Sequence, residues 1–180
     1  MKAMPENAIV GFLSELLALE YGYSPAEARQ IRIAAVLHDT GKQFIPDHIK
    51  NKPSKLSPQE FDIMKTHTTL GFELLSCLHG DLGEKSKNIA FFHHERWDGQ
   101  GYWRVPSHLL PRYVSVVSLC DVAVALLYRR PYKSPWPPVE VLAYLKSQAG
   151  IQFCPQLTDM FISLVRRDTR ISAIFMEVSQ

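Results

Sequence analysis

The chain has 180 residues, of which 46% are hydrophobic and 21% charged, and its formal net charge is +2. This composition is typical of a globular domain and excludes collagen-like, mucin-like and disordered chains. Both signs of charge are interspersed without a long Lys/Arg run, so we expect no binding to a nucleic-acid polymer. Since such a length buries about two-thirds of the unfolded surface, we expect one domain over residues 1–180, with a core at about 8–165 and a tail at 166–180.

The cysteines and the apolar segments indicate the cellular compartment of the protein. Three cysteines without a CxxC pair fit a reducing environment, and we expect all three thiols to be packed inside the protein. The N-terminal residues lack the apolar segment of a secretory signal. The longest apolar stretch, Tyr113 to Tyr128, contains Asp121 and is shorter than the roughly 20 residues of a membrane span. We therefore expect a cytoplasmic protein without a membrane span.

The first half of the chain has helical periodicity. Apolar residues recur at helical spacing from Ile9 to Leu17, and Gly22 follows as a C-terminal cap. Ser24-Pro25 predicts the start of a second helix, which ends near His38-Asp39. After a loop with Gly41, Pro46 and Pro53, Ser57-Pro58 begins a third helix that continues through Leu74.

The second half continues this pattern. We expect helices over about Glu84 to Glu95, from Pro111 to about Arg129, over Val139 to Gln148 and over Pro155 to Val165. The residues beyond Val165 are left unassigned. No alternating run of apolar and polar residues is long enough to indicate a sheet, so the predicted fold class is all-α.

Several ionisable residues lie on the apolar faces of these helices. His38 follows Ala34 and Ala35 at helical spacing, and His67 shares a stripe that includes Ile63 and Leu74. Three more ionisable residues have apolar neighbours at helical spacing: His93, His94 and Asp121. One buried histidine is usually a hydrogen-bonded core residue, because an unpaired buried charge is costly. A metal would compensate all of these residues at once, so their accumulation on four helical segments favours a metal site.

These residues lie in motifs that resemble a known family. The string from His38 to Lys42 (HDTGK) is similar to the HDxGK signature of the HD superfamily of metal-dependent phosphohydrolases. The string from His93 to Trp103 (HHERWDGQGYW) is similar to the HHExxDGxGYP signature of its HD-GYP subfamily. The resemblance extends over about Ala8 to Val165. It implies an HD-domain helical bundle with a buried two-metal site.

The resemblance also implies roles for single residues. It places the metal ligands at six positions, with Asp39 as the bridging residue: His38, Asp39, His67, His93, His94 and Asp121. Asp39 and Lys42 would act in catalysis, and Lys42, Arg130 and Tyr102 would contact the substrate. The implied function is hydrolysis of cyclic di-GMP, through a hydroxide that bridges the metals, to the linear dinucleotide and in some members to GMP. Imidazole and carboxylate ligands, together with the resemblance, favour two divalent transition-metal ions, iron or manganese.

Two features depart from the family pattern. The first-helix positions that help to hold a third metal in the family fall on Lys2 and Glu6 here, so we expect two metals. Trp103 replaces the proline of the GYP triplet. Because proline fixes φ and lacks an N–H donor, we expect the Gly101–Trp103 loop to be less rigid and to present a different surface to a protein partner.

Two functions remain open from the sequence alone. The first is an enzyme that hydrolyses cyclic di-GMP or, more narrowly, another phosphoester. The second is a degenerate module that binds ligand or a signalling protein, through the Gly101–Trp103 loop, without turnover. Glu95 is expected either to form a cap or salt bridge or to assist catalysis. Arg96 and Arg104 are expected to be solvated charges that would attract anions if they lay near a phosphate.

Overall fold

The computed structural model of the protein describes residues 4–128 and 134–178, and these residues are almost entirely helical. The α-helices are α1 (Glu6–Tyr21), α2 (Pro25–Val36), α3 (Asp47–Lys50), α4 (Pro58–Leu74), α5 (Gly80–Phe92), α6 (Arg112–Leu127), α7 (Pro138–Ser147), α8 (Pro155–Arg167) and α9 (Thr169–Val178). Three 3-10 helices are η1 (Thr40–Phe44), η2 (Leu75–Cys77) and η3 (Ser107–Leu109). Within the described ranges β-pairing is limited to an isolated bridge between Ala149 and Phe153, so the all-α prediction is confirmed.

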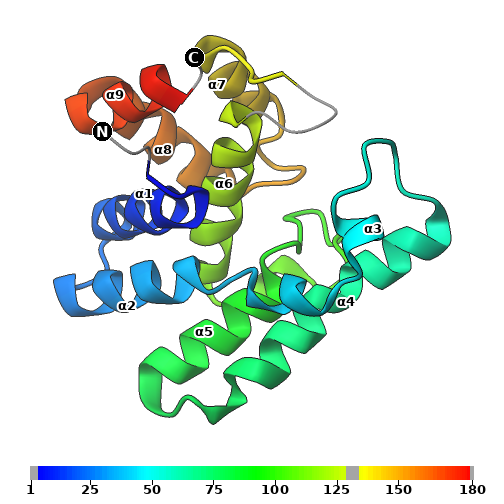
Figure 1. Ribbon diagram of the computed structural model, residues 1–180. Helices are drawn as coiled ribbons and strands as arrows, with labels where there is room; N and C mark the ends of the chain where they lie inside the picture. Colours follow the sequence, from blue (N-terminus) through cyan, green and yellow to red (C-terminus); the bar gives the residue numbers. More distant parts are fainter. Residues whose placement is uncertain (1–3, 129–133, 179–180) are drawn as a thin grey trace.

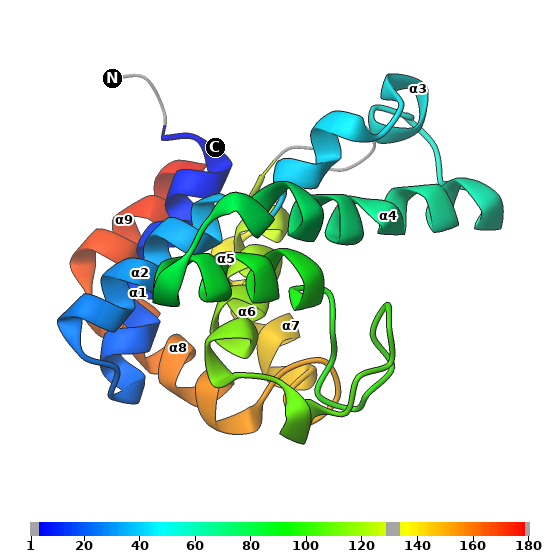
Figure 2. The ribbon, with the colours of Figure 1, turned by 90° about the horizontal axis from the view of Figure 1, so that it is seen from below.

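Helix α6 runs through the centre of the bundle (Figure 1). It packs against α1, α5, α7 and α8, while α2 packs against α1 and α5. Helices α4 and α5 lie side by side, and η1 lies against α4. Helix α3 and the N-terminal half of α4 extend away from the bundle, as both views show (Figure 2). Among the described residues, no helix combines the length and the apolar character needed to cross a bilayer.

The helix ends follow the sequence signals closely. Gly22 adopts the left-handed conformation with φ of 111°, and its N–H bonds to carbonyl groups of α1. Ser24 forms a capping box with Glu27, and Ser57 forms one with Glu60. Three boundaries differ from the prediction: α2 ends at Val36, before the His38-Asp39 pair, and α5 both begins earlier, at Gly80, and ends earlier, at Phe92.

The core also differs from the predicted pattern in places. The first turns of α5 bury Gly83 and Ser86, which are not apolar, so hydrophobic periodicity does not detect this part of the helix. Conversely, the side chain of Ile63 is 42% exposed because it belongs to the half of α4 that extends beyond the bundle. Cys77 is exposed, which contradicts the prediction that all three thiols are packed, whereas Cys120 and Cys154 are buried.

The segment after Val165 forms α9, which the periodicity leaves unassigned. Ile171 and Phe175 lie one turn apart on this helix and are both fully buried. The Phe175 ring lies 6.2 Å from the ring of Phe161 on α8. The end of the described chain is therefore part of the hydrophobic core.

Gly41 allows η1 to approach α4 closely. A Cβ atom at this position would lie 1.9 Å from the carbonyl oxygen of His67 and 2.6 Å from the backbone nitrogen of Gly71. Both of these are backbone atoms of α4, which cannot rotate away as a side chain can. The absence of a side chain at Gly41 therefore sets the distance between the turn that carries Asp39 and the helix that carries His67.

We expect Gly41→Ala to lower the free energy of unfolding by about 3 kcal/mol or more, because the added methyl group must push η1 and α4 apart. Urea unfolding followed by circular dichroism measures this change. Gly71→Ala is the matched control, since its Cβ would meet the Ala90 side chain at 3.3 Å and alanine favours a helix. A Gly41→Ala variant as stable as Gly71→Ala would contradict this account.

Candidate metal centre

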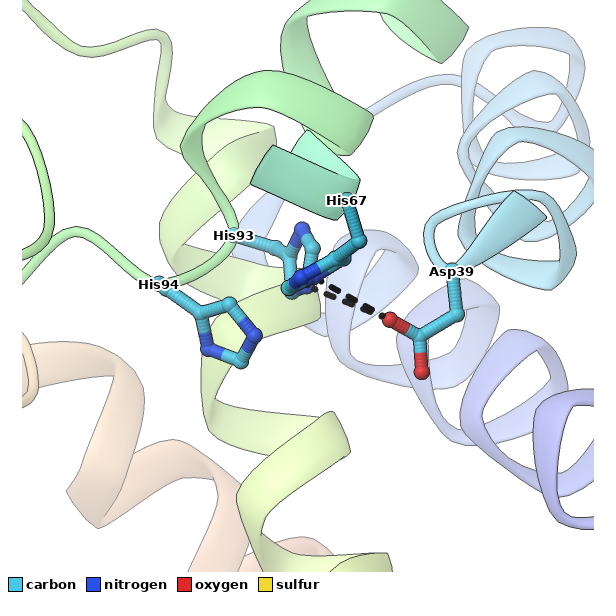
Figure 3. Close-up of side chains that lie close together, drawn as sticks. All are labelled: Asp39, His67, His93 and His94. Atoms are coloured by element: carbon cyan, nitrogen blue, oxygen red, sulfur yellow. Dashed lines mark hydrogen bonds and ion pairs between the residues drawn. The ribbon is translucent and has the colours of Figure 1, made fainter. Parts of the chain in front are cut away.

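Four parts of the chain bring the six predicted ligands together. His38 and Asp39 lie in the turn between α2 and η1, and His67 lies in the middle of α4. The other three come from the end of α5 and from α6: His93, His94 and Asp121. Figure 3 shows the side chains of Asp39, His67, His93 and His94 converging on one region. The exposed fractions of His38, His67 and His93 are at most 1%.

The ligand atoms form two groups that share His93. Asp39, His67, His93 and His94 each offer an atom within 4.8 Å of the others, and His38, His93 and Asp121 form the second group on the same criterion. Asp39 also connects the groups. Its Oδ1 lies 3.4 Å from His67 Nε2, and its Oδ2 lies 3.3 Å from His38 Nε2. This arrangement agrees with a bridging role for Asp39.

The protonation of three histidines is fixed by the backbone. His38 Nδ1 lies 2.7 Å from the carbonyl oxygen of Ala35, and His67 Nδ1 lies 2.7 Å from that of Met64. His93 Nδ1 makes similar contacts with carbonyl oxygens of α5, at 3.0 and 3.1 Å. A carbonyl oxygen only accepts, so Nδ1 donates in each case and the lone pair of the neutral ring is on Nε2. All three Nε2 atoms point into the cluster, which is the arrangement that metal-binding histidines use.

Without a cation, these inward lone pairs are poorly compensated. The Nε2 atoms of His67 and His93 are only 3.3 Å apart, although both are acceptors in the neutral form. Asp39 Oδ1 is buried and makes no hydrogen bond within the protein, and His38 Nε2 faces only carboxylate oxygens, at 3.3 Å from Asp39 Oδ2 and from Asp121 Oδ1. Buried polar atoms are normally paired, so such orphaned acceptors are a strong structural sign of a bound cation. The donor set therefore fits a divalent metal site.

The pKa values show how the charges balance within the protein itself. Burial opposes a charge on His38, but the nearby carboxylates of Asp39 and Asp121 outweigh it and raise the pKa of His38 to about 10. Burial raises the pKa of both carboxyl groups, but the neighbouring His38 imidazolium outweighs it and holds the pKa of each well below its usual value. A proton on His38 thus occupies the place of a cation between the two carboxylates.

Two other histidines remain neutral. Burial, with a contribution from the nearby His93, lowers the pKa of His67 to about 4. The same two causes hold the pKa of His94 well below its usual value. Both rings therefore carry a free lone pair at neutral pH, which is the state that binds a metal.

Lys42 lies beside this cluster. Its Nζ is 2.5 Å from Asp39 Oδ2, and its side chain is 36% exposed. The ammonium group therefore sits between a candidate ligand and solvent. Arg130, the second residue predicted to contact phosphate, lies outside the described residues.

A cleft of about 580 Å³ opens from the cluster. Asp39, His67, His94 and Asp121 lie at its inner end, and Tyr102 also lines it. Its cationic residues are Lys42, Lys50 and Lys52. The last two were not selected from the sequence, because only the approach of α3 to α4 brings them to the cleft. Each of the three ammonium groups is paired with a carboxylate within the protein: Lys42 with Asp39, Lys50 with Asp47 and Lys52 with Glu60.

The Gly101–Trp103 loop is held in place by Glu95. The buried carboxylate of Glu95 accepts hydrogen bonds from the backbone N–H groups of Trp103, at 2.7 Å, and Val105, at 2.8 Å. A Cβ on Gly101 would lie 2.5 Å from the Glu95 Cα, so only glycine fits there. Of the roles predicted for Glu95, the described contacts support the structural one.

Trp103 also holds the Gly101–Trp103 loop in place. Its contacts contradict the prediction that this loop is less rigid than one with proline. Its N–H makes a bond to Glu95 that a proline could not make. Its indole Nε1–H donates to Thr68 at 3.1 Å, and its ring stacks on Phe91 with centroids 5.6 Å apart. The loop in turn places Tyr102 against His94, with ring centroids 4.4 Å apart. Burial and then the negative charge of Asp39 raise the pKa of Tyr102 to about 12, so Tyr102 is a hydrogen-bond donor at neutral pH.

Comparisons with known proteins agree with this geometry. A family model described as "HD domain" matches residues 9–126. A Thermotoga maritima protein named cyclic di-GMP phosphodiesterase is 40% identical over 163 residues, which are 90% of this chain and 44% of the relative. A Vibrio cholerae protein named 3′3′-cGAMP-specific phosphodiesterase 2 is 39% identical over 85% of this chain and 30% of the relative. The chain thus spans less than half the length of these curated relatives.

A solved structure has the same fold. The protein Bd1817 from Bdellovibrio bacteriovorus, described as an HDG"Y"P protein, superimposes with a TM-score of 0.71 at 19% identity, over 89% of this chain and 51% of that one. Together with the family match and the named relatives, this likeness confirms the resemblance to HD-GYP proteins that the two sequence motifs indicate. The chain belongs to the HD domain family.

Proposed function

We propose that this chain is a metal-dependent phosphodiesterase that hydrolyses cyclic di-GMP to the linear dinucleotide. The observation that carries the proposal is the convergence of six candidate ligand side chains, four of which line a cleft that also contains three lysines. The names of the relatives, which include cyclic di-GMP and 3′3′-cGAMP phosphodiesterases, support this class of substrate.

The donor set supports two divalent transition-metal ions, and the family resemblance favours iron or manganese among them. His67, His94 and one oxygen of Asp39 would hold one ion, and His38, Asp121 and the other oxygen of Asp39 would hold the second. His93 belongs to both groups. Imidazole with carboxylate is a ligand set that suits these metals better than magnesium or calcium. Such ions, when bound, activate a water molecule and stabilise charge on a phosphodiester.

Side chains of the cleft would bind the substrate. A phosphodiester is an anion, and the three lysines of the cleft would attract it toward the cluster. Lys42 is the lysine nearest to the candidate ligands, since it already contacts Asp39, and its flexible end can turn to a phosphate oxygen. Tyr102 carries its proton at neutral pH and lines the same cleft, where its hydroxyl can donate to the substrate.

The alternative of a module that binds without turnover keeps the same metals and cleft. The replacement of proline by Trp103 is the reason to consider a degenerate module. Because Glu95 and Trp103 hold the Gly101–Trp103 loop in place, the described contacts favour the enzyme. The Gly101–Trp103 loop remains a predicted contact for a signalling protein, and Trp103 is 39% exposed there. Metal-loaded protein that binds cyclic di-GMP but releases no linear product over hours would establish the alternative.

We expect the purified protein to contain about two transition-metal ions per chain, as two overlapping ligand groups require. Asp39→Ala should lose both ions, because each oxygen of Asp39 serves one group. His94→Ala and Asp121→Ala are the matched variants, and each should retain one ion, because each residue belongs to a single group. Elemental analysis of samples expressed with added iron or manganese gives the stoichiometry, and circular dichroism verifies folding. Full occupancy in folded Asp39→Ala would exclude the bridging role.

We expect Lys42→Gln to keep the metal content near that of the wild type while lowering kcat/KM for cyclic di-GMP by about one to three orders of magnitude. This is the loss expected when a charge-assisted contact worth roughly 1.5–4 kcal/mol is removed from the transition state. Lys146→Gln is the control, since Lys146 pairs with Asp159 on the surface. Steady-state rates at equal metal loading decide the matter, and an unchanged rate for Lys42→Gln would remove Lys42 from the substrate site.

A further inference from the structure

A second cleft, of about 390 Å³, adjoins the first. The two clefts share four residues: Phe61, His94, Tyr102 and Val122. A ligand whose phosphate lies at the candidate metal cluster can therefore reach into both clefts. His93, His94 and Tyr102 already have roles in the proposed function, which leaves the other polar residues of the second cleft without an assigned role.

Arg104 differs from the other cations of this second cleft. Lys65 pairs with Asp62, and Arg96 forms two hydrogen bonds with Asp98. Within the described part of the chain, the guanidinium of Arg104 has no ion pair or hydrogen bond. Its five N–H donors are therefore available to a ligand.

The backbone of Arg104 is held in an unfavourable conformation. Its φ of 56° is in the left-handed region, and among the described residues no other non-glycine residue has a positive φ. The N–H groups on both sides of Arg104, those of Trp103 and Val105, converge on the two carboxylate oxygens of Glu95. This convergence requires the turn at Arg104. Such strain persists only where the surroundings fix it, and it is frequent in ligand-binding segments.

The remaining lining suits a nucleobase better than a second phosphate. Gln100 and Gln152 add side-chain amides, and the rings of Phe61 and Tyr102, 5.5 Å apart, border the cleft. Aromatic rings stack on bases, and amides and guanidinium groups bind base edges. The carboxylate of Glu95 accepts the backbone N–H groups of Trp103 and Val105, and within the described residues it forms no ion pair with Arg104.

We propose that the second cleft binds one base of the cyclic dinucleotide and that Arg104 selects guanine there. This inference rests on the proposed function. Guanine presents two acceptors, O6 and N7, which match the forked donors of arginine. Adenine presents N7 beside an amino group, and that amino group would face the N–H donors of the guanidinium. Arg104 would therefore favour cyclic di-GMP over cyclic di-AMP.

The test compares Arg104→Asn and Arg104→Lys with the wild type at equal metal loading. Asparagine tolerates the left-handed backbone and so preserves the turn while removing the guanidinium. Lysine keeps the charge but lacks the fork. Both kcat/KM and the dissociation constant are measured for cyclic di-GMP and for cyclic di-AMP, so that binding is followed independently of turnover.

We expect both variants to lower the preference for cyclic di-GMP over cyclic di-AMP by about five- to hundredfold, the discrimination that a bidentate arginine–guanine contact provides. An equal loss for both dinucleotides in Arg104→Asn that Arg104→Lys restores would show a phosphate contact and overturn base selection. An unchanged preference in both variants would place Arg104 outside the site. If metal-loaded wild type neither binds nor hydrolyses either dinucleotide, the proposed function itself fails.

Discussion

The structure depends on one electrostatic constraint, the burial of a cluster in which acceptor atoms outnumber donors. Three histidines donate Nδ1–H to the backbone and turn their Nε2 lone pairs inward, toward two carboxylates. Such a group is stable only if positive charge lies within it. In the protein itself a proton on His38 meets part of this need, and a pair of divalent ions would meet all of it. The helices are arranged so that this charge can be shared among four segments of the chain.

The approach of those segments is governed by backbone contacts. Gly41 lets the turn that carries His38 and Asp39 lie against α4 at a distance that any Cβ would prevent. Gly101 performs a similar function for the loop that carries Tyr102, since this loop lies directly on the backbone of Glu95. Glycine in both motifs is thus a requirement of close packing, and the polar side chains beside each glycine acquire their positions from it.

Much of this arrangement is predictable from local sequence. The caps at Gly22, Ser24 and Ser57 depend on neighbouring residues, so they mark helix ends without tertiary information. Five of the six candidate ligands stand out for the same reason, because each follows or faces apolar residues at helical spacing, and the HDTGK motif adds Asp39. Their convergence agrees with the family resemblance, while their role as metal ligands remains a prediction.

Other features depend on contacts between distant segments and could not be predicted. The first turns of α5 bury a glycine and a serine, which no apolar pattern marks. Ile63 has the spacing of a core residue but lies on a helix that extends past the bundle. The approach of Lys50 and Lys52 to the cluster, and the bond from Trp103 to Glu95, appear only when the chain is folded.

The position of Trp103 has a spectroscopic consequence. Its indole is only partly exposed, stacks on Phe91 and donates to Thr68, the residue that follows His67 on α4. Displacement of the loop from α4 and α5 breaks both contacts and transfers the ring to water, and indole emission moves to longer wavelength in a more polar environment. The chain has two other tryptophans, Trp97 and Trp136, whose background signals can be removed by substitution. Trp103 therefore serves as an intrinsic fluorophore that reports the state of the loop beside the candidate metal centre.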